Sequence, residues 1–338
     1  MKEKKTGGSR LKISNEKLKF IAIPLTLFII ILVLDPADFL TVGNFRSMSF
    51  QMVELGLISL AMMFAFISGS IDLSLASTAN IAAMVVAFIL KSFDGHELTD
   101  QQWGWVLVLC IFAAAAAGVL CGLFNGFLVA KCKLQPMLAT LGSMYLFSGI
   151  VFMFTQGKSI AGFPELISDF GNGTTFGIAN TLFILIFVIV LSAVLLNKMR
   201  FGKELKYFGT NKKASLFSGI NNSKIMMKVF VLCGLIAGIT GFEYVIKINT
   251  AKADYGASYV FTSVLCISLG GVSPSGGKGG VFGVVCGLIA MQLLSSGFSI
   301  LGLGTSMKNF LWGVLLLGVM VFNYYLECRE MKKKYAGK

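Results

Sequence analysis

The sequence has little charge, very little proline and a single histidine. Of its 338 residues, 13% are charged, 5 are proline and one is histidine. Soluble domains carry about 25% charged residues, so the low charge excludes an ordinary soluble enzyme and also a disordered chain. One histidine cannot build a histidine-rich metal site, and no Gly-x-Ser-x-Gly elbow is present. The sequence therefore offers no catalytic residues and no metal ligands.

Apolar residues are in large excess. They make up 56% of the chain, and the mean hydropathy is +0.80. A membrane-spanning helix needs about 20 mostly apolar residues, so the composition predicts an all-α, polytopic membrane protein. Cysteines inside apolar segments act as small core side chains and not as halves of disulfides; these are Cys110, Cys121, Cys233, Cys266 and Cys286.

Ten continuous apolar segments are expected to span the membrane. The first follows a basic stretch as a signal peptide would, but no small-residue cleavage site follows it, so we expect an uncleaved helix. One transmembrane domain, 20–326, would lie between basic tails at 1–19 and 327–338. The predicted spans are 20–35, 52–68, 74–90, 104–130, 137–156, 180–197, 229–246, 259–270, 281–297 and 309–326.

Basic residues report the orientation of the spans. The net charge is +13, but the lysines and arginines fall between apolar segments, which argues for topology signals and against nucleic-acid binding. If the N-terminus is cytoplasmic, 23 of the 29 basic residues lie inside and 6 outside, as the positive-inside rule requires. Both termini and the long basic loop 198–228 are then cytoplasmic.

That loop also divides the spans into six and four. The last four can be matched to spans two to five, and the two blocks would run through the membrane in opposite directions. Inverted repeats of this kind are a common transporter design, with the pathway at their interface. The prediction rests on topology, because the two blocks show no convincing sequence similarity.

One acidic residue stands between two predicted spans. In the segment Ser68-Gly69-Ser70-Ile71-Asp72-Leu73-Ser74, an acid must face protein, water or a helix end. We expect Asp72 to cap the following helix by accepting its free N–H groups; a position along a solute pathway is a compatible alternative. Uncharged polar residues in the spans are further pathway candidates, giving the set Ser70, Asp72, Asn80, Asn125 and Gln292.

Other motifs have structural interpretations. The glycine-rich segment 269–280 lacks the spacing of a phosphate-binding loop and is expected to be a tight turn where backbones approach closely. Glu243 and Lys247, four residues apart, can pair on one helix, and Glu54 is expected near the membrane surface. Glycines at four-residue spacing predict close helix packing; they are Gly118, Gly122, Gly126, Gly234, Gly238, Gly283 and Gly287.

The loop 198–228 contains a segment with a different character. Between Gly209 and Gly219 the sequence favours a short helix that exposes Leu216 and Phe217 among lysines. Such a helix could insert into a groove on a partner protein. It could instead lie on anionic lipid headgroups.

Four separated motifs give the chain a resemblance to a known family. They are 68–77, Gln135–Gly142, Gly209 with Ala214 and Ser218–Ile220, and 269–271 with 276–279. Together they resemble the permease subunits of ribose-type sugar ATP-binding-cassette importers, a family that includes autoinducer-2 permeases. The segments 162–166 and 254–258 look closer to the autoinducer-2 permeases, so the solute stays open between a ribose-type sugar and autoinducer-2.

The resemblance implies a ten-span permease of the vitamin-B12-permease type, in the inner membrane of a bacterium. It implies pairing with a second copy or a sister permease, an extracytoplasmic solute-binding protein, and a separate ATPase that binds ATP and magnesium. It places ATPase coupling on Gly209, Ala214, Leu216, Phe217, Gly219 and Ile220. The permease itself would need no cofactor and perform no chemistry.

Two other classes of membrane protein fit the sequence less well. A secondary transporter would use buried acids to couple an ion gradient to transport, but few acids fall within the spans. A membrane enzyme or scaffold would need a polar cluster that the sequence does not show. Uptake into vesicles that have an ion gradient but no ATPase would favour the secondary transporter.

The charge distribution makes a testable prediction about topology. In a cysteine-free background, an impermeant thiol reagent should label Asp94→Cys in intact cells and Lys212→Cys only after permeabilisation, because the two positions are expected on opposite sides. Equal labelling of both positions in intact cells would contradict the ten-span topology.

Overall fold

The computed structural model describes residues 7–93, 98–175 and 177–336. His96 and Asp94 lie outside the described residues, as do 1–6 and 337–338 of the two tails. The described chain is almost entirely helical, with four strands of two residues each. This confirms the all-α class predicted from composition.

Ten apolar helices coincide with the ten predicted spans. Three have shorter apolar stretches: α1 (Gly7–Leu34), apolar from Phe20, α12 (Ala257–Leu269), and α14 (Thr305–Ala336), apolar to Val321. The other seven are long and apolar enough to cross a membrane: α3 (Val42–Ile67), α4 (Leu75–Ser92), α5 (Asp100–Ala130), α6 (Pro136–Thr155), α8 (Asn180–Asn197), α11 (Asn222–Ile248) and α13 (Val281–Ile300).

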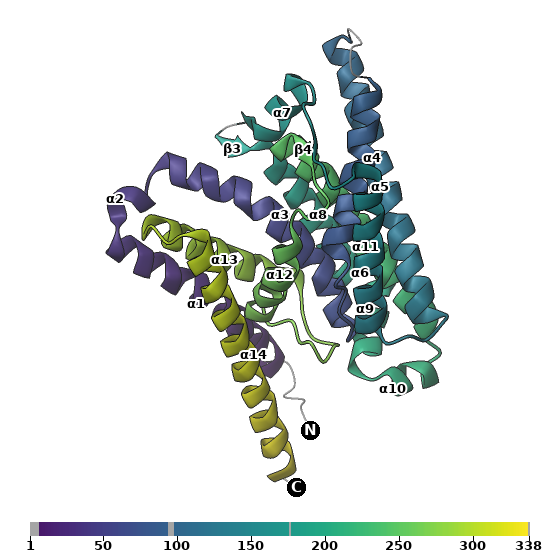
Figure 1. The fold of residues 1–338 in the computed structure, drawn as a ribbon. Helices are drawn as coiled ribbons and strands as arrows, with labels where there is room; N and C mark the ends of the chain where they lie inside the picture. The colour runs from purple at the N-terminus through teal and green to yellow at the C-terminus, as the bar shows by residue number, and fades with distance from the viewer. Residues whose placement is uncertain (1–6, 94–97, 176, 337–338) are drawn as a thin grey trace.

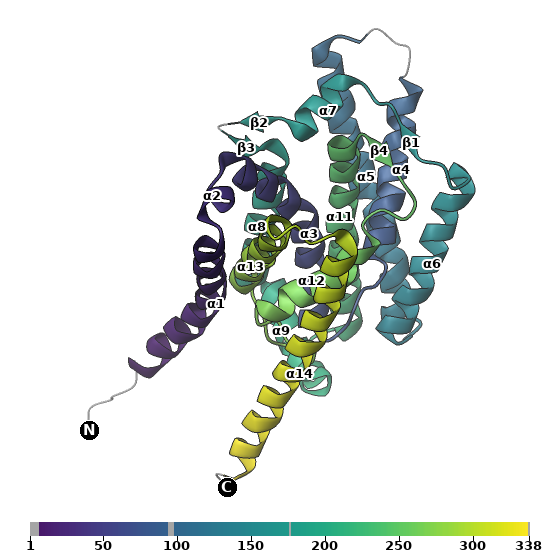
Figure 2. The same ribbon diagram turned by 60° about the vertical axis from the view of Figure 1, so that its left-hand side comes forward.

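Short elements gather at the two ends of the bundle. The upper end carries α2 (Pro36–Phe39), α7 (Glu165–Asn172) and two strand pairs, and the lower end carries α9 (Arg200–Thr210) and α10 (Lys212–Phe217) (Figure 1). The start of α1 and the end of α14 also lie at the lower end (Figure 2). Each strand pair is antiparallel: β1 (Ile160–Ala161) with β4 (Thr250–Ala251), and β2 (Thr174–Thr175) with β3 (Ile178–Ala179).

Helix α11 is the centre of the bundle, in contact with α3, α4 and α5. Its contact with α5 is made by the predicted glycines. A Cβ atom on Gly118 would collide with the carbonyl oxygen of Gly234, and one on Gly234 would collide with that of Gly118. The backbones of α5 and α11 therefore touch directly, which confirms that these glycines serve helix packing.

The contacts between helices support the predicted repeat. Helix α3 packs on α12 and α13, and its counterpart α11 packs on α4 and α5. The contacts of α4 with α5 and α6 are likewise matched by those of α12 with α13 and α14. These four pairs of contacts match between the two blocks, as expected of a pseudo-twofold pair, whereas the contacts of α5 with α6 and of α3 with α4 have no equally extensive counterpart in the second block.

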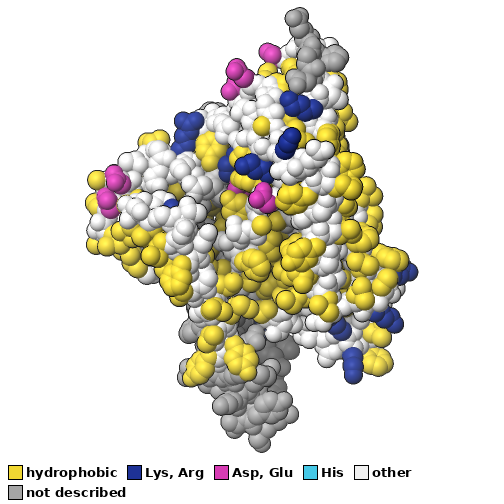
Figure 3. Space-filling view, viewed as in Figure 1, with side chains coloured by type: hydrophobic (Ala, Val, Ile, Leu, Met, Phe, Trp, Pro, Cys, Tyr) yellow, Lys and Arg dark blue, Asp and Glu magenta, His cyan; other side chains and the backbone are white. Residues whose placement is uncertain are grey.

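The surface is divided by side-chain type. Hydrophobic side chains cover the middle of the face shown in Figure 3, acidic side chains lie in its upper half beside several basic ones, and a second group of basic side chains lies around the lower region that contains α10. The five cysteines expected in the core are buried and free. A hydrophobic belt between polar ends is the surface expected of a protein embedded in lipid.

Candidate functional site: a buried polar turn and an exposed cytoplasmic helix

The chain between α3 and α4 forms a buried turn around Asp72. Gly69 adopts a φ of +70°, which lets the chain reverse after α3 ends at Ile67. One carboxylate oxygen of Asp72 accepts hydrogen bonds from the backbone N–H of Ser74 (3.0 Å) and from its hydroxyl (2.6 Å). Ser74 is the N-cap residue of α4, so Asp72 holds the residue that precedes the first turn of this helix. The expected cap on the free N–H groups of the helix itself is wrong, because the hydrogen bonds that Asp72 accepts in the described chain come from Ser74.

This turn is connected to α5. The Asn125 side-chain N–H₂ donates to the Ser74 hydroxyl at 2.7 Å, which in turn donates to Asp72. All three side chains are buried. A chain of donors that ends on a carboxylate stabilises its negative charge and fixes each rotamer. Asp72 and Asn125 therefore belong to one network, although the sequence separates them by more than fifty residues.

Helix α6 contacts the same turn through Thr140. Its hydroxyl accepts from the backbone N–H of Leu73 (3.2 Å) and lies 3.3 Å from the carbonyl of Ile71. Thr140 lies in the motif 135–142, which the sequence marked only by resemblance. The remaining pathway candidate on this turn, Ser70, donates to the carbonyl of Ala65 and lies 2.5 Å from the Ser68 hydroxyl.

The other two pathway candidates lie apart from the turn. Asn80 donates to the carbonyls of Ala253 (2.8 Å) and Tyr255 (3.1 Å), and Gln292 donates to Gln51 (3.2 Å). Both are buried. The structure thus joins Asp72 and Asn125 in one network, places Ser70 beside them, and separates Asn80 and Gln292 from them. A role for all five in solute passage stays a prediction.

A second buried polar cluster was missed by the sequence analysis. The expected pairing of Glu243 with Lys247 is wrong: the Lys247 ammonium binds Glu54 of α3 at 2.8 Å and the carbonyl of Phe50 at 3.0 Å. The Tyr255 hydroxyl donates to the same Glu54 oxygen at 2.8 Å. Glu54 is 1% exposed and therefore lies in the interior, where a single acid joins α3, α11 and the loop before α12.

Glu243 is also fully buried, and among the described residues neither of its carboxyl oxygens has a hydrogen-bond partner. Lys247 prefers Glu54 because α3 and α11 are in contact over much of their length, which a single-helix pattern cannot show. The available sequence signal was Glu54 itself, the third residue of the predicted span 52–68 and the one charged residue in it.

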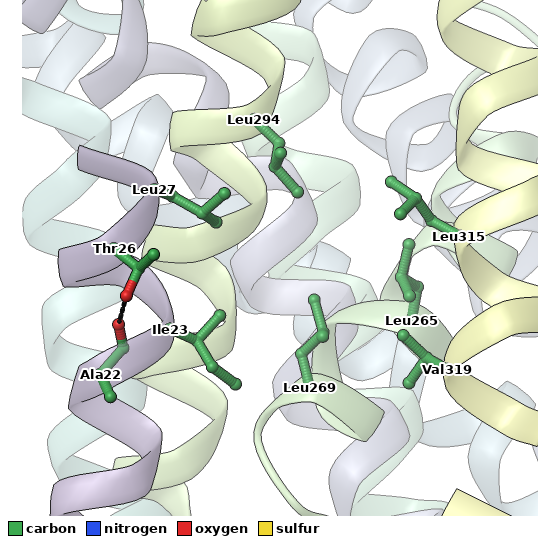
Figure 4. Close-up of a pocket in the computed structure, with 9 residues that line it drawn as sticks. All are labelled: Ala22, Ile23, Thr26, Leu27, Leu265, Leu269, Leu294, Leu315 and Val319. Atoms are coloured by element: carbon green, nitrogen blue, oxygen red, sulfur yellow. Dashed lines mark hydrogen bonds between the residues drawn. The ribbon is translucent and has the colours of Figure 1, made fainter. Parts of the chain in front are cut away.

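One groove in the described structure does not suit a polar solute. It has a volume of about 410 Å³ and lies between α1, α12, α13 and α14 (Figure 4). Its lining is apolar apart from Thr26, whose hydroxyl donates to the carbonyl of Ala22 at 2.8 Å. Sugar-like solutes need hydrogen-bonding groups in their site, so this apolar groove is not a candidate solute site.

The segment expected to contact a partner forms a fixed, exposed element. Asn211 accepts from the backbone N–H groups of Lys213 and Ala214 and so caps α10. At the same end of α10, the Asn222 side-chain N–H₂ of α11 donates to the carbonyl of Lys212 at 2.8 Å. The predicted short helix is thereby confirmed and is held against the start of α11.

The side chains of this segment divide into exposed and buried groups. Phe217 is 92% exposed and Leu216 is 61% exposed, so both predicted anchors point away from the protein. Ala214 and Gly219 are also exposed, Ile220 is half-buried, and Gly209 is buried. Gly209 therefore cannot touch a partner in this conformation; it contacts the interior of the permease instead.

A bundle of ten apolar helices, eight of them in two matched blocks of four, with an exposed helix at one end, is typical of a polytopic transport protein. The chain belongs to the family described as the permease component of branched-chain amino acid transport systems, whose model matches residues 45–320. It is thus a transport permease subunit and a multi-pass protein of the bacterial inner membrane.

Curated relatives confirm the resemblance drawn from the motifs. The ribose import permease protein RbsC of Bacillus subtilis is 30% identical over 86% of this chain and 87% of its own length. RbsC of Escherichia coli K12 is 30% identical over 91% and 94%. The autoinducer 2 import system permease protein LsrD of E. coli K12 is 26% identical over 84% of each chain.

The turn at Asp72 yields a first structural test. Asp72→Asn keeps an acceptor for Ser74 and should assemble at close to wild-type levels, whereas Asp72→Leu leaves the buried N–H and hydroxyl of Ser74 without their acceptor and should cost about 1–3 kcal/mol. Membrane abundance and the melting temperature in detergent measure this. Equal stability of Asp72→Leu and wild type would refute a structural role of Asp72 in this turn.

The Glu54 cluster yields a second test. Lys247→Met leaves Glu54 buried without its cation and should lower stability by about 3–5 kcal/mol, and adding Glu54→Gln should recover part of the loss. Glu243→Gln is the matched control, because the Glu243 carboxyl accepts no hydrogen bond from the described residues. If Glu243→Gln were as harmful as Lys247→Met, Lys247 would be paired with Glu243 after all.

Proposed function

We propose that this chain is the membrane-spanning subunit of an ATP-binding-cassette importer for a sugar-like solute. A separate ATPase would bind ATP and magnesium, dock on α10 and drive transport. A solute-binding protein would deliver the solute at the opposite end of the bundle. A second copy of the chain or a sister permease would complete the pathway. The ribose and autoinducer-2 import permeases among its relatives support this assignment.

The observation that carries the proposal is the exposed, anchored helix α10. A helix that displays Phe217 and Leu216 to solvent is stable only because its backbone is capped and tied to α11. Protein interfaces concentrate their binding energy in a few large apolar side chains. Lys212 and Lys213, which are exposed beside them, suit the polar rim, where charges orient a partner.

The same end of the bundle carries one group of basic side chains, the start of α1 and the end of α14 (Figures 2 and 3). We infer that this end is cytoplasmic, with both termini on that side, because 23 of 29 basic residues were assigned there. An ATPase must act from the cytoplasm, so the inferred orientation presents α10 to the correct compartment.

The solute is proposed to be a ribose-type sugar, with autoinducer-2 as the second candidate. Both follow from relatives, and the ribose permeases are more similar to this chain, at 30% against 26% identity. Uptake of labelled D-ribose, autoinducer-2 and L-leucine into proteoliposomes holding the complete importer separates the candidates. L-leucine is included because the family description names branched-chain amino acids.

Docking of the ATPase is tested with Phe217→Ala. The variant should insert into the membrane normally. The amount of ATPase that co-purifies with it should fall by about tenfold or more, because an exposed aromatic anchor has been removed. The transport rate should fall by the same factor. Phe187→Ala is the matched control, since Phe187 is an exposed phenylalanine on membrane-spanning α8 and should retain the ATPase.

The outcome also separates the rival interpretations of α10. A helix lying on lipid headgroups predicts that Lys212→Gln with Lys213→Gln is at least as harmful as Phe217→Ala and that no ATPase is released. A secondary transporter predicts uptake under an ion gradient without any ATPase. Normal ATPase retention by Phe217→Ala would remove α10 as the docking element.

A further inference from the structure

Three segments that are far apart in the sequence meet directly behind α10. They are the end of α9 at Gly209, the end of α3 with its turn at Ile67–Gly69, and the glycine-rich loop between α12 and α13 at Gly276–Gly277. The backbone N–H of Gly277 donates to the carbonyl of Ile67 at 2.9 Å. We call this contact the glycine junction.

The junction is made mostly from backbone atoms; the one side chain that closes on it is Thr210, since a Cβ atom on Gly277 would collide with the Thr210 hydroxyl and lie 2.8 Å from the Thr210 nitrogen. A Cβ atom on Gly209 would collide with the carbonyl oxygen of Ile67 and lie 2.5 Å from the Gly277 nitrogen. A Cβ atom on Gly276 would lie 2.7 Å from the Gly209 oxygen and 3.0 Å from the Gly69 nitrogen. The predicted close backbone approach in the segment 269–280 is thereby confirmed.

Such a contact transmits displacement efficiently. Long side chains absorb a shift by changing rotamer, whereas touching backbones must move together or separate. Gly69, Gly276 and Gly277 also have φ values of +70°, +88° and +74°, which other residues rarely adopt. The three segments therefore fit one another in one arrangement and have little freedom to slide.

The junction lies between two elements already described. On one side, Gly209 is two residues before Asn211, which caps the exposed helix α10. On the other side, Gly69 is three residues before Asp72, whose network fixes the start of α4 and reaches Asn125 of α5. A path of direct contacts thus leads from the docking helix to the buried polar turn.

We propose that Gly209 and Gly277 are positioning residues for coupled transport: through the glycine junction, a displacement of α9 and α10 moves the α3–α4 turn and the α12–α13 loop as one unit. This inference rests on the proposed docking of an ATPase on α10. The proposal explains why Gly209 is buried: it contacts the interior of the permease and not the ATPase. The segment 276–277 then has a role in coupling in addition to forming a turn.

The test compares glycine-to-alanine variants of the complete importer in proteoliposomes. The measured quantity is solute imported per ATP hydrolysed, with whichever of D-ribose or autoinducer-2 the wild type transports. Gly209→Ala and Gly277→Ala should each keep the ATPase bound and each lower this coupling ratio about tenfold. The double variant should show about the same tenfold loss, because both changes open one contact and their effects are not additive.

Two control variants separate coupling from packing. Gly118→Ala creates an equally severe backbone collision between α5 and α11, away from the junction, and should lower abundance while leaving the coupling ratio normal. Gly142→Ala on α6 meets no atom within 4 Å and should change neither quantity. If Gly209→Ala does not assemble, Gly277→Ala alone gives the coupling ratio.

The outcomes distinguish this inference from the function on which it rests. A normal coupling ratio in the junction variants, an equal loss in Gly118→Ala, or a loss of about a hundredfold in the double variant would overturn the junction while leaving ATPase docking intact. A wild-type chain that binds no ATPase, or transports neither solute, would overturn the proposed function and the junction with it.

Discussion

In a bundle whose outer surface meets lipid, helices gain little by hiding apolar side chains from one another, because lipid chains are equally apolar. Close approach of backbones supplies the attraction instead, and glycine allows it. The contact between α5 and α11 is of this kind. Helix α11 also packs against α3 and α4. The same device at Gly209 and Gly277 joins the lower ends of α3, α9 and the α12–α13 loop.

Hydrogen bonds between buried polar groups are the second interaction that positions the helices. Glu54 accepts hydrogen bonds from Lys247 and Tyr255, which are distant in the sequence. Asp72 accepts two from Ser74, whose hydroxyl in turn accepts one from Asn125 of α5. Without water in the surroundings, a carboxylate must find such donors within the protein. The two acids therefore fix the relative positions of helices that apolar packing alone would leave less defined.

The sequence predicted the helices well because a membrane span is a continuous apolar segment, visible without knowing its neighbours. It also predicted α10, since Asn211 and Gly219 bound a short helical stretch among polar residues. The partner of Lys247 could not be predicted: Glu243 is its neighbour in sequence, but Glu54, 193 residues away, is its neighbour in space. The contacts of Thr140 and Gly277 could not be predicted for the same reason, because each residue contacts the turn after α3, which is distant from it in the sequence.

The position of α11 at the centre has a consequence for how the protein is made. Its glycine face fits α5, yet more than ninety residues separate the end of α5 at Ala130 from the start of α11 at Asn222. At a synthesis rate of about 5–20 residues per second, α5 spends roughly 5–20 s in the membrane before its partner emerges. During that interval the first half of the bundle exposes Gly118 and Gly122 to lipid. Assembly of the bundle therefore waits for the synthesis of α11. A nascent chain that stops before Asn222 lacks the helix that packs against the glycines of α5.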